Sequence, residues 1–476
     1  MRYRFFQILA LVLLVLWAAM VWAGPCVLNK AELSILGLIN QARRDPAAMA
    51  LRVGLAPDQI LATRPELAHI FANGLHPLAF SPKLQAAARG HATDMAAQGY
   101  YGYESPEGLA PFDRVKATGY LAVAVKESLG MLSFLNYMGL EEASWGLFSN
   151  MYTQELTGDS GELKILAPDV EDVGISVVSA RFSLQGYPSN VYISTCDFGK
   201  SKVSQIAREL MALIDQARAN PLGVAEDLGM DPEELIEQFP ELAEVFHSGL
   251  PPLAWDERLF DAAYMHGQDM LERGYFSHIT PEGLGWEERI EQAGYPASSS
   301  GEAMALLVFT DEREAREVAK SLFERIFRRE FSETRNILNP EFKEAGVAFV
   351  RTVPGQLDDE SSDFAPFFNY LLVVNLAAPI EPGPSAIVGN VYEDKDHDGL
   401  YDLGEGLAAA VVAIGETGAD PVCELTDGAG GVEMALGAGD FVLSVACPDG
   451  SPISEGFPLH LGDENHGFFI CVAPGE

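Results

Sequence analysis

The pentapeptide Ile39-Asn40-Gln41-Ala42-Arg43 returns 175 residues later as Ile214-Asp215-Gln216-Ala217-Arg218, with one substitution. The same offset continues to Glu155 and Glu330, after which the first copy carries about three extra residues. One offset kept over more than a hundred residues predicts that a domain has been duplicated. Three further stretches return at this spacing: Pro65-Glu66-Leu67-Ala68 as Pro240-Glu241-Leu242-Ala243, His91-x-x-Asp94-Met95 as His266-x-x-Asp269-Met270, and Ser105-Pro106-Glu107-Gly108-Leu109 as Thr280-Pro281-Glu282-Gly283-Leu284.

Each copy begins with helical periodicity and ends with β-rich segments. Residues 33–50 and 84–99 space their apolar side chains as helices do, and Gly99 is a stop signal. Residues 174–178 and 191–194 read as strands, with counterparts in the second copy at 347–350 and 370–374. Helices first and strands later favour an α+β layered sandwich over a doubly wound parallel sheet.

The chain changes character after a proline-rich stretch at residues 379–384, which reads as a stiff linker. Beyond it, short alternating strands are expected at 386–392, 409–414 and 441–446, a pattern typical of a small all-β sandwich. The predicted organisation is a signal peptide at 1–23, a first domain at 27–200, a second at 201–380 and the β-sandwich at 385–476.

The first residues read as an export signal. Arg2 and Arg4 precede an apolar stretch at 5–20, and Val21-Trp22-Ala23 offers a cleavage site. The competing interpretation is an uncleaved anchor, because the apolar stretch is nearly long enough to span a bilayer. Cleavage would leave no stable membrane span and a secreted, periplasmic or cell-surface protein.

Five cysteines fit such an oxidising location. A bridge from Cys26 to Cys196 would tie the ends of the first copy together, and one pair is the simplest arrangement among Cys423, Cys447 and Cys471. The pairing itself does not follow from sequence.

The acidic balance of the chain bears on its partners. Asp and Glu total 69 against 31 Lys and Arg, a formal net charge of −38. Such a field repels phosphate backbones, so nucleic acid is excluded as a partner, whereas cations are attracted.

The second copy resembles the CAP superfamily (cysteine-rich secretory, antigen 5 and pathogenesis-related 1 proteins) in its bacterial secreted form, known as SCP. The resemblance rests on Gly274-Tyr275-Phe276-Ser277-His278-x-x-Pro281-x-Gly283, Gly294-Tyr295, Gly301-Glu302-Ala303 and Asn336-Ile337-Leu338-Asn339-Pro340. It implies an α/β/α sandwich whose cleft is lined by two histidines and two glutamates that can bind a divalent metal.

In the second copy the resemblance implies a metal site made of His278, Glu302 and Glu330. The second family histidine is missing, since Thr334 stands before Arg335-Asn336-Ile337-Leu338. Imidazole and carboxylates suit zinc or a related ion, with an open position left for water.

The first copy departs further from the family pattern. Tyr103 stands where His278 does, Glu127 and Glu155 keep both carboxylates, and Glu162 lies near the position of the second histidine. Carboxylates without imidazole could hold a hard cation such as calcium, or could simply have raised pKa values.

These degenerate clefts favour a binding or scaffold protein over an enzyme. A metal-dependent hydrolase acting through His278, Glu302 and Glu330 is the first alternative. Lipid or sterol binding in the cleft is the second, by family analogy alone. The ligand, whether protein, glycan or lipid, does not follow from the sequence.

The sharpest local motif is the acidic loop at residues 394–405. Carboxylates stand at positions 1, 3, 5, 9 and 12 of the loop, Gly399 at position 6 and Leu400 at position 7, where a backbone carbonyl would serve. The flanking strands resemble the calcium-binding B-type repeats of bacterial surface adhesins, which are prealbumin-like β-sandwiches. The expected cofactor is a stabilising calcium ion, held by Asp394, Asp396, Asp398, Leu400, Asp402 and Glu405.

Overall fold

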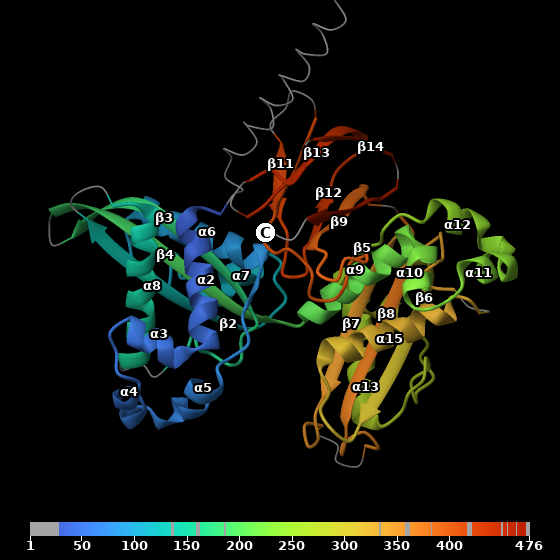
Figure 1. Ribbon diagram of the computed structural model, residues 1–476, viewed down its shortest axis with the longest axis horizontal. Helices are drawn as coiled ribbons and strands as arrows, with labels where there is room; N and C mark the ends of the chain where they lie inside the picture. Colours follow the sequence, from blue (N-terminus) through green and yellow to red (C-terminus); the bar gives the residue numbers. More distant parts are fainter. Residues whose placement is uncertain are drawn as a thin grey trace, which may run out of the picture.

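The computed structural model (Figure 1) describes residues 28–134, 138–158, 162–184, 187–332, 335–357, 362–381, 383–416, 421–448, 451–454, 456–462 and 464–472. The predicted signal peptide lies outside these residues. Within them, every helix is too short or too polar to span a bilayer.

The two copies fold alike, each as one four-stranded sheet with helices on both faces. The first sheet has the order β1-β3-β4-β2, and the second has the equivalent order β5-β7-β8-β6. In each, the short first strand pairs in parallel and the other pairs are antiparallel. The α+β prediction is confirmed.

The elements of the first repeat are α2 (Lys30–Arg44), α3 (Pro46–Arg52), α4 (Pro57–Thr63), η1 (Pro65–Leu67), α5 (Ala68–Asn73), β1 (Ala79–Phe80), α6 (Pro82–Gln98), α7 (Pro111–Ala117), β2 (Ala122–Phe134), α8 (Leu140–Thr157), β3 (Asp172–Leu184) and β4 (Tyr187–Ser201). Those of the second are α9 (Gln205–Ala219), α10 (Pro221–Asp227), α11 (Pro232–Gln238), η2 (Pro240–Leu242), α12 (Ala243–Ser248), β5 (Ala254–Trp255), α13 (Glu257–Arg273), α14 (Trp286–Gln292), β6 (Ala297–Phe309), α15 (Ala315–Arg329), β7 (Glu344–Thr352) and β8 (Phe368–Pro379).

One difference from the predicted helices lies near the start of the first repeat. The helix expected over 33–50 is two helices, because Asp45 ends α2 and its side chain caps the nitrogen of Ala48 in α3. Pro46 has no N–H to donate and therefore suits the first position of a new helix.

The two faces of each sheet carry different helices. In the first repeat, Leu129 of β2 packs with Met95 of α6, whereas Gly130 faces Leu147 and Met151 of α8. Successive residues of a strand point to opposite faces, so α6 and α8 cover opposite sides of the sheet.

A buried arginine from the repeated pentapeptide holds the first repeat together. The Arg43 guanidinium donates to the carbonyl oxygens of His76, Ile165 and Ala167, each at 2.8 Å. Glu155 accepts hydrogen bonds from the backbone nitrogens of the same loop, at Ile165 and Leu166, both at 2.7 Å. Arginine and glutamate thus satisfy both kinds of backbone group in one buried loop.

The second repeat contains the same arrangement, in which a buried arginine and a glutamate bind the backbone of one loop; we call this arrangement the clamp. Arg218 donates to the carbonyls of Pro251, Ile337 and Asn339, while Glu330 accepts from the nitrogens of Asn336 and Leu338. Burial lowers the pKa of Arg43 and of Arg218 to about 10, and the neighbouring carboxylates oppose that shift. Both arginines therefore remain charged at neutral pH.

Residues beyond the linker form two sheets that share one apolar core. The four-stranded sheet has the order β11-β10-β13-β14, and the three-stranded sheet has the order β12-β9-β15. Ile387, Val412, Val432 and Val445 are among the side chains buried between them. The strands are β9 (Ala386–Glu393), β10 (Val411–Gly415), β11 (Val422–Leu425), β12 (Gly431–Ala435), β13 (Gly439–Ala446), β14 (Phe457–Leu461) and β15 (His466–Val472).

This β-rich region lies across the junction of the two repeats (Figure 1). Arg208 of α9 joins all three units, since its guanidinium lies 3.0 Å from Asp172 of the first repeat and 3.4 Å from Asp427 of the β-rich region. Tyr401 of the β-rich region is buried in the core of the second repeat. The three units therefore pack as one assembly.

The cysteine pairings suggested by the sequence are wrong. Cys196 is a free thiol in the core, because it points inward from the middle of β4, and Cys447 and Cys471 are free as well. Cys423 is disulfide-bonded, and Cys26 lies outside the described residues.

We expect Arg43→Met to destabilise the first repeat strongly. The change leaves three carbonyl oxygens without a hydrogen-bond donor, and each buried polar group without a partner costs roughly 1–3 kcal/mol. The free energy of unfolding should therefore fall by about 3 kcal/mol or more. The matched control is Arg44→Met, since Arg44 is exposed at the next position of α2. Differential scanning calorimetry checks this, and equal melting of the two variants would contradict the clamp.

Candidate functional site

The second repeat places Glu302 at the centre of a polar cluster. Its buried carboxylate lies on β6, with Oε1 2.7 Å from Nδ1 of His278 and Oε2 accepting from Arg289 of α14 at 2.6 Å. Arg289 also donates to the carbonyls of His278 and Leu284, which fixes the loop that carries the histidine. The His278 side chain is 44% exposed, so the cluster opens to solvent.

The first repeat builds a related cluster from a different histidine. Oε1 of Glu127 accepts from Arg114 of α7 at 2.9 Å and lies 2.8 Å from Nδ1 of His91, a buried residue of α6. Tyr103 does not reach Glu127. Its hydroxyl accepts from Lys164 at 2.8 Å, and its carbonyl accepts from Arg114.

His266, the counterpart of His91, has another role in the second repeat. Its Nε2 lies 3.0 Å from the carbonyl oxygen of Ser277, next to His278. Each repeat thus sets one histidine against its central glutamate: the helix histidine His91 in the first, where Tyr103 replaces the loop histidine, and the loop histidine His278 in the second. Sequence reasoning missed the arginines of both clusters, although Arg114 and Arg289 keep the 175-residue offset and precede Gly119-Tyr120 and Gly294-Tyr295 at matched spacing.

Glu155 and Glu330 do not join these clusters, which corrects the predicted three-residue metal sites. Glu155 lies in the last turn of α8 and Glu330 follows α15, and each uses its carboxylate oxygens to accept from backbone nitrogens of the clamp. Burial raises the pKa of both, that of Glu330 to about 7.

The two glutamates of each repeat lie on opposite faces of its sheet. Glu127 shares a face with Leu129, against α6, whereas Glu155 comes from α8 on the other side. Glu302 shares a face with Met304, against α13, whereas Glu330 follows α15. Across the part of the chain that the structure describes, neither pair of glutamates contributes to a convergent group of metal ligands.

The structure reveals a second buried carboxyl beside Glu127. Asp197 of β4 stands opposite Glu127 of β2 and is fully buried, and among the described residues the only group that its carboxyl can pair with is the Glu127 carboxylate. Burial, followed by the nearby Glu127 carboxylate, raises the pKa of Asp197 well above its ordinary value. The second repeat has Asn375 at the equivalent position opposite Glu302.

The acidic loop brings three of its carboxylates together. Ligand atoms of Asp394, Asp396 and Asp398 all lie within 4.8 Å of one another, the one such group among the described residues. Asp394 folds the loop by accepting from the nitrogens of His397 and Gly399. Gly399 adopts a φ of 82°, which only glycine takes without strain.

The remaining predicted ligands are held differently. Glu405 accepts from the backbone nitrogens of Lys395 and Asp402, and Asp402 accepts from Lys320 of α15 at 2.7 Å. The backbone N–H of Leu400 donates a hydrogen bond to the Asp398 carboxylate at 2.7 Å. The loop is thus folded by its own carboxylates, with three of them left facing one another.

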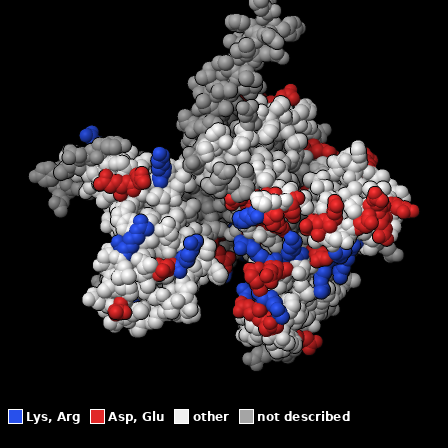
Figure 2. Space-filling view, in the orientation of Figure 1, with Lys and Arg blue, Asp and Glu red and all other residues white. Residues whose placement is uncertain are grey.

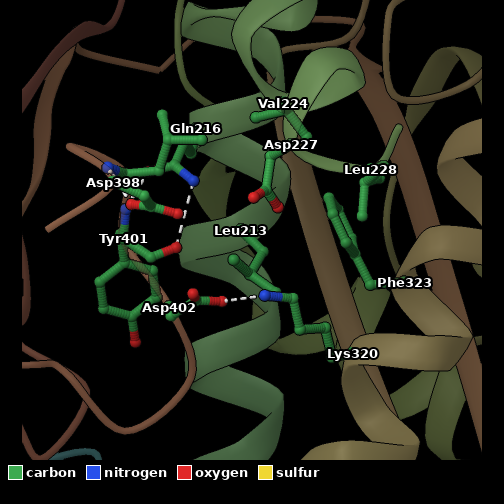
Figure 3. Close-up of a pocket in the computed structure, with 11 residues that line it drawn as sticks. Leu213, Gln216, Val224, Asp227, Leu228, Lys320, Phe323, Asp398, Tyr401 and Asp402 are labelled. Carbon is green, nitrogen blue, oxygen red and sulfur yellow. Dashed lines mark hydrogen bonds and ion pairs between the residues drawn. The ribbon is translucent and has the colours of Figure 1, made fainter. Parts of the chain in front are cut away.

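The loop also rests on the second repeat. Gln216, from the repeated pentapeptide, donates to the carbonyl of Tyr401 and accepts from its nitrogen, and Lys320 reaches Asp402 beside them (Figure 3). Burial raises the pKa of Asp398, and the nearby carboxylates of Asp396, Asp402 and Asp227 add to that shift. A bound cation would relieve this repulsion.

Comparison with known proteins settles the family of the repeats. The model of the CAP family, described as the cysteine-rich secretory protein family, matches residues 36–198 and 246–368, more than half of the chain. The chain belongs to the CAP family. The resemblance drawn from the sequence is therefore confirmed for both CAP domains, whereas the adhesin-type calcium repeat stays a prediction.

Two solved structures are similar to parts of the chain. An outer surface protein from Borrelia burgdorferi is 16% identical, with a TM-score of 0.19, over 30% of this chain and 89% of its own. An extracellular protein containing a SCP domain from Bacillus anthracis str. Ames is 18% identical, with a TM-score of 0.20, over 44% of this chain and 58% of its own. Among curated proteins, none matches.

We expect Asp197→Asn to stabilise the first CAP domain at neutral pH. Because the folded chain binds the Asp197 proton more tightly than the unfolded chain, its carboxyl favours folding at low pH and disfavours it increasingly as pH rises above the ordinary aspartate value. The gain in melting temperature should therefore be large at pH 7.5 and shrink towards pH 4, at about 2–4 °C per kcal/mol.

The second CAP domain supplies the reverse control. Asn375→Asp would create a carboxyl pair beside Glu302, and it should lower the melting temperature at pH 7.5 more than at pH 4. A gain from Asp197→Asn that did not depend on pH would reject the assignment of a buried, protonated carboxyl.

Proposed function

We propose that this CAP-family protein is secreted or displayed at the cell envelope, where its CAP domains bind partners and do not hydrolyse them. The observation that carries the proposal is the state of the central glutamates. Glu127 and Glu302 are each buried and already held by an arginine, Arg114 and Arg289, and by a histidine.

Metal-dependent hydrolysis fits these clusters poorly. A catalytic zinc site needs three protein ligands around one open position. Here the second glutamate lies across the sheet in each domain, and the Arg289 guanidinium occupies Oε2 of Glu302. His278 and Glu302 alone offer two donors.

Exposed apolar side chains beside the clusters support binding. Tyr101, Leu109 and Phe112 are each more than 40% exposed in the first CAP domain, as is Phe276 at the position equivalent to Tyr101. Exposed apolar groups gathered near a polar cleft mark interaction surfaces. The first CAP domain also shows a largely uncharged face, whereas acidic and basic groups gather on the second (Figure 2).

Two observations support a location outside the cytosol. Cys423 is disulfide-bonded, which requires an oxidising compartment in most organisms. The family to which the chain belongs is described as secretory.

Zinc titration of the full chain by calorimetry tests the binding proposal. We expect no stoichiometric tight site after removal of metal by a chelator. Glu302→Gln and Glu127→Gln form a matched pair, one in each CAP domain. One tightly bound zinc per chain, lost in Glu302→Gln and kept in Glu127→Gln, would overturn the proposal in favour of a metallohydrolase.

We also infer that the loop at 394–405 binds calcium. Calcium prefers six to eight oxygen ligands, and Asp394, Asp396 and Asp398 offer carboxylates within reach of one ion. Bound there, the ion supplies charge neutralisation and rigidity. The contacts of the same loop with Gln216 and Lys320 would carry that rigidity into the docking of the β-rich region on the second CAP domain.

Calcium should raise the melting temperature of the full chain, and the rise should disappear in Asp396→Asn. A ligand present at a hundred times its Kd adds about 2.7 kcal/mol to the stability of the unit that binds it. Asp311→Asn is the control, since Asp311 is an exposed aspartate paired with Arg313 far from the loop in sequence. Identical melting temperatures with calcium and with a chelator would contradict calcium binding by the loop.

A further inference from the structure

A cavity of about 670 Å³ lies where the three units meet, apart from both Glu–Arg–His clusters and from the acidic loop. Lys83 lines it from the first CAP domain, Asp215 and Trp255 from the second, and Glu424 and Glu433 from the β-rich region. Small-molecule sites have volumes of about 300–1,000 Å³ and often lie at domain junctions. The size and place of this cavity are those of a ligand site.

Acidic groups outnumber basic ones on the cavity walls. The lining includes two basic side chains, Lys83 and Arg208, and five acidic ones, Asp215, Glu257, Glu424, Asp427 and Glu433. Both basic groups are already paired, Lys83 with Glu257 at 3.7 Å and Arg208 with Asp427 at 3.4 Å. Asp215, Glu424 and Glu433 remain, and none of these three forms an ion pair with another described residue.

The remaining carboxyls are weaker acids than they would be in water. Desolvation raises the pKa of Asp215 to about 7, against the opposing charge of Arg218 on the same helix. It also raises the pKa of Glu424 and of Glu433, although both residues keep part of their surface exposed and Lys83 opposes the shift of Glu433. Asp215 accepts one backbone hydrogen bond, from Leu253, and Glu433 accepts one from Trp255. A cation in the cavity would stabilise all three in their charged form.

Apolar and aromatic side chains make up much of the remaining wall. Trp255, Phe80 and Met211 contribute, together with Leu425 and Val432 of the β-rich region. Apolar walls suit a hydrocarbon body, and an aromatic face such as that of Trp255 attracts ammonium groups.

A single metal ion does not fit this arrangement. The three carboxyls come from different elements, α9, β11 and β12, and they do not appear among the described groups whose ligand atoms converge within 4.8 Å. Separated negative charges around an apolar space call for an elongated ligand with separated positive charges.

We propose that this three-way cavity binds an elongated organic cation, with ammonium groups at two or more of Asp215, Glu424 and Glu433 and a hydrocarbon body along the apolar wall. The site goes beyond the function proposed for the CAP clusters and does not depend on the calcium loop. Its ligand class is the aliphatic diamines and polyamines.

Calorimetric titration of the full chain tests the proposal with two probes of equal length and opposite charge, 1,7-diaminoheptane and heptanedioate. The diamine should bind and the diacid should not. Diamine affinity should also rise between pH 6 and pH 8, as Asp215 loses its proton. Absence of diamine binding at millimolar concentration, or equal binding of the diacid, would overturn the proposal.

Two variants locate the site. Glu433→Gln keeps an oxygen that can accept from the backbone N–H of Trp255 but removes one negative charge. Diamine affinity should therefore fall about tenfold, equivalent to about 1.4 kcal/mol. Ala86→Trp, at an exposed position of α6 on the cavity wall, should project into the space and weaken binding. Glu244→Gln, on exposed α12 outside the cavity, is the control. Diamine binding that survived both cavity variants unchanged would place the ligand elsewhere.

Discussion

Two buried arginines set the conditions under which both CAP domains fold. Arg43 and Arg218 each bring a charge into the interior, and a buried charge is tolerated only where hydrogen bonds and an opposite charge surround it. The loops at 165–167 and 337–342 supply the carbonyls, and Glu155 and Glu330 hold the nitrogens of the same loops. The opposing charge comes from Glu155 near Arg43, and from Asp215 and Glu330 near Arg218. The helix that opens each domain is thereby fixed to the connection between its last helix and the sheet. This constraint accounts for the presence of the arginine at the same position in both copies of the pentapeptide.

The sequence predicted the large-scale organisation because duplication and periodicity are local signals. The offset of 175 residues identified two copies, and the stop signal at Gly99 agrees with α6 ending at Gln98. The roles of the second glutamates could not be predicted in this way. Whether Glu330 faces a cleft or a loop depends on which side of the sheet α15 packs, and no spacing in the chain encodes that choice. The same limit hid Asp197, whose significance arises only from its position across the sheet from Glu127.

The two CAP domains neutralise their central glutamates with different histidines but with an arginine at the same position. Where the first domain has Tyr103 in place of the loop histidine, the helix histidine His91 contacts the central glutamate, while in the second domain His278 does so and His266 contacts a backbone carbonyl. The arginine partner, Arg114 or Arg289, is present in both. Preserving the arginine while exchanging the histidine indicates that neutralising the buried carboxylate is the stricter requirement.

The ion pairs of Arg208 link the two CAP domains and the β-rich region to one another. The guanidinium belongs to the second CAP domain, but its counter-ions, Asp172 and Asp427, belong to the first domain and to the β-rich region. Cutting the chain at either domain boundary would leave a half-buried charge without one of its partners and would open apolar surface beside it. Isolated fragments should consequently be poor substitutes for the three units together, and biochemical work is best done on a chain that contains all three.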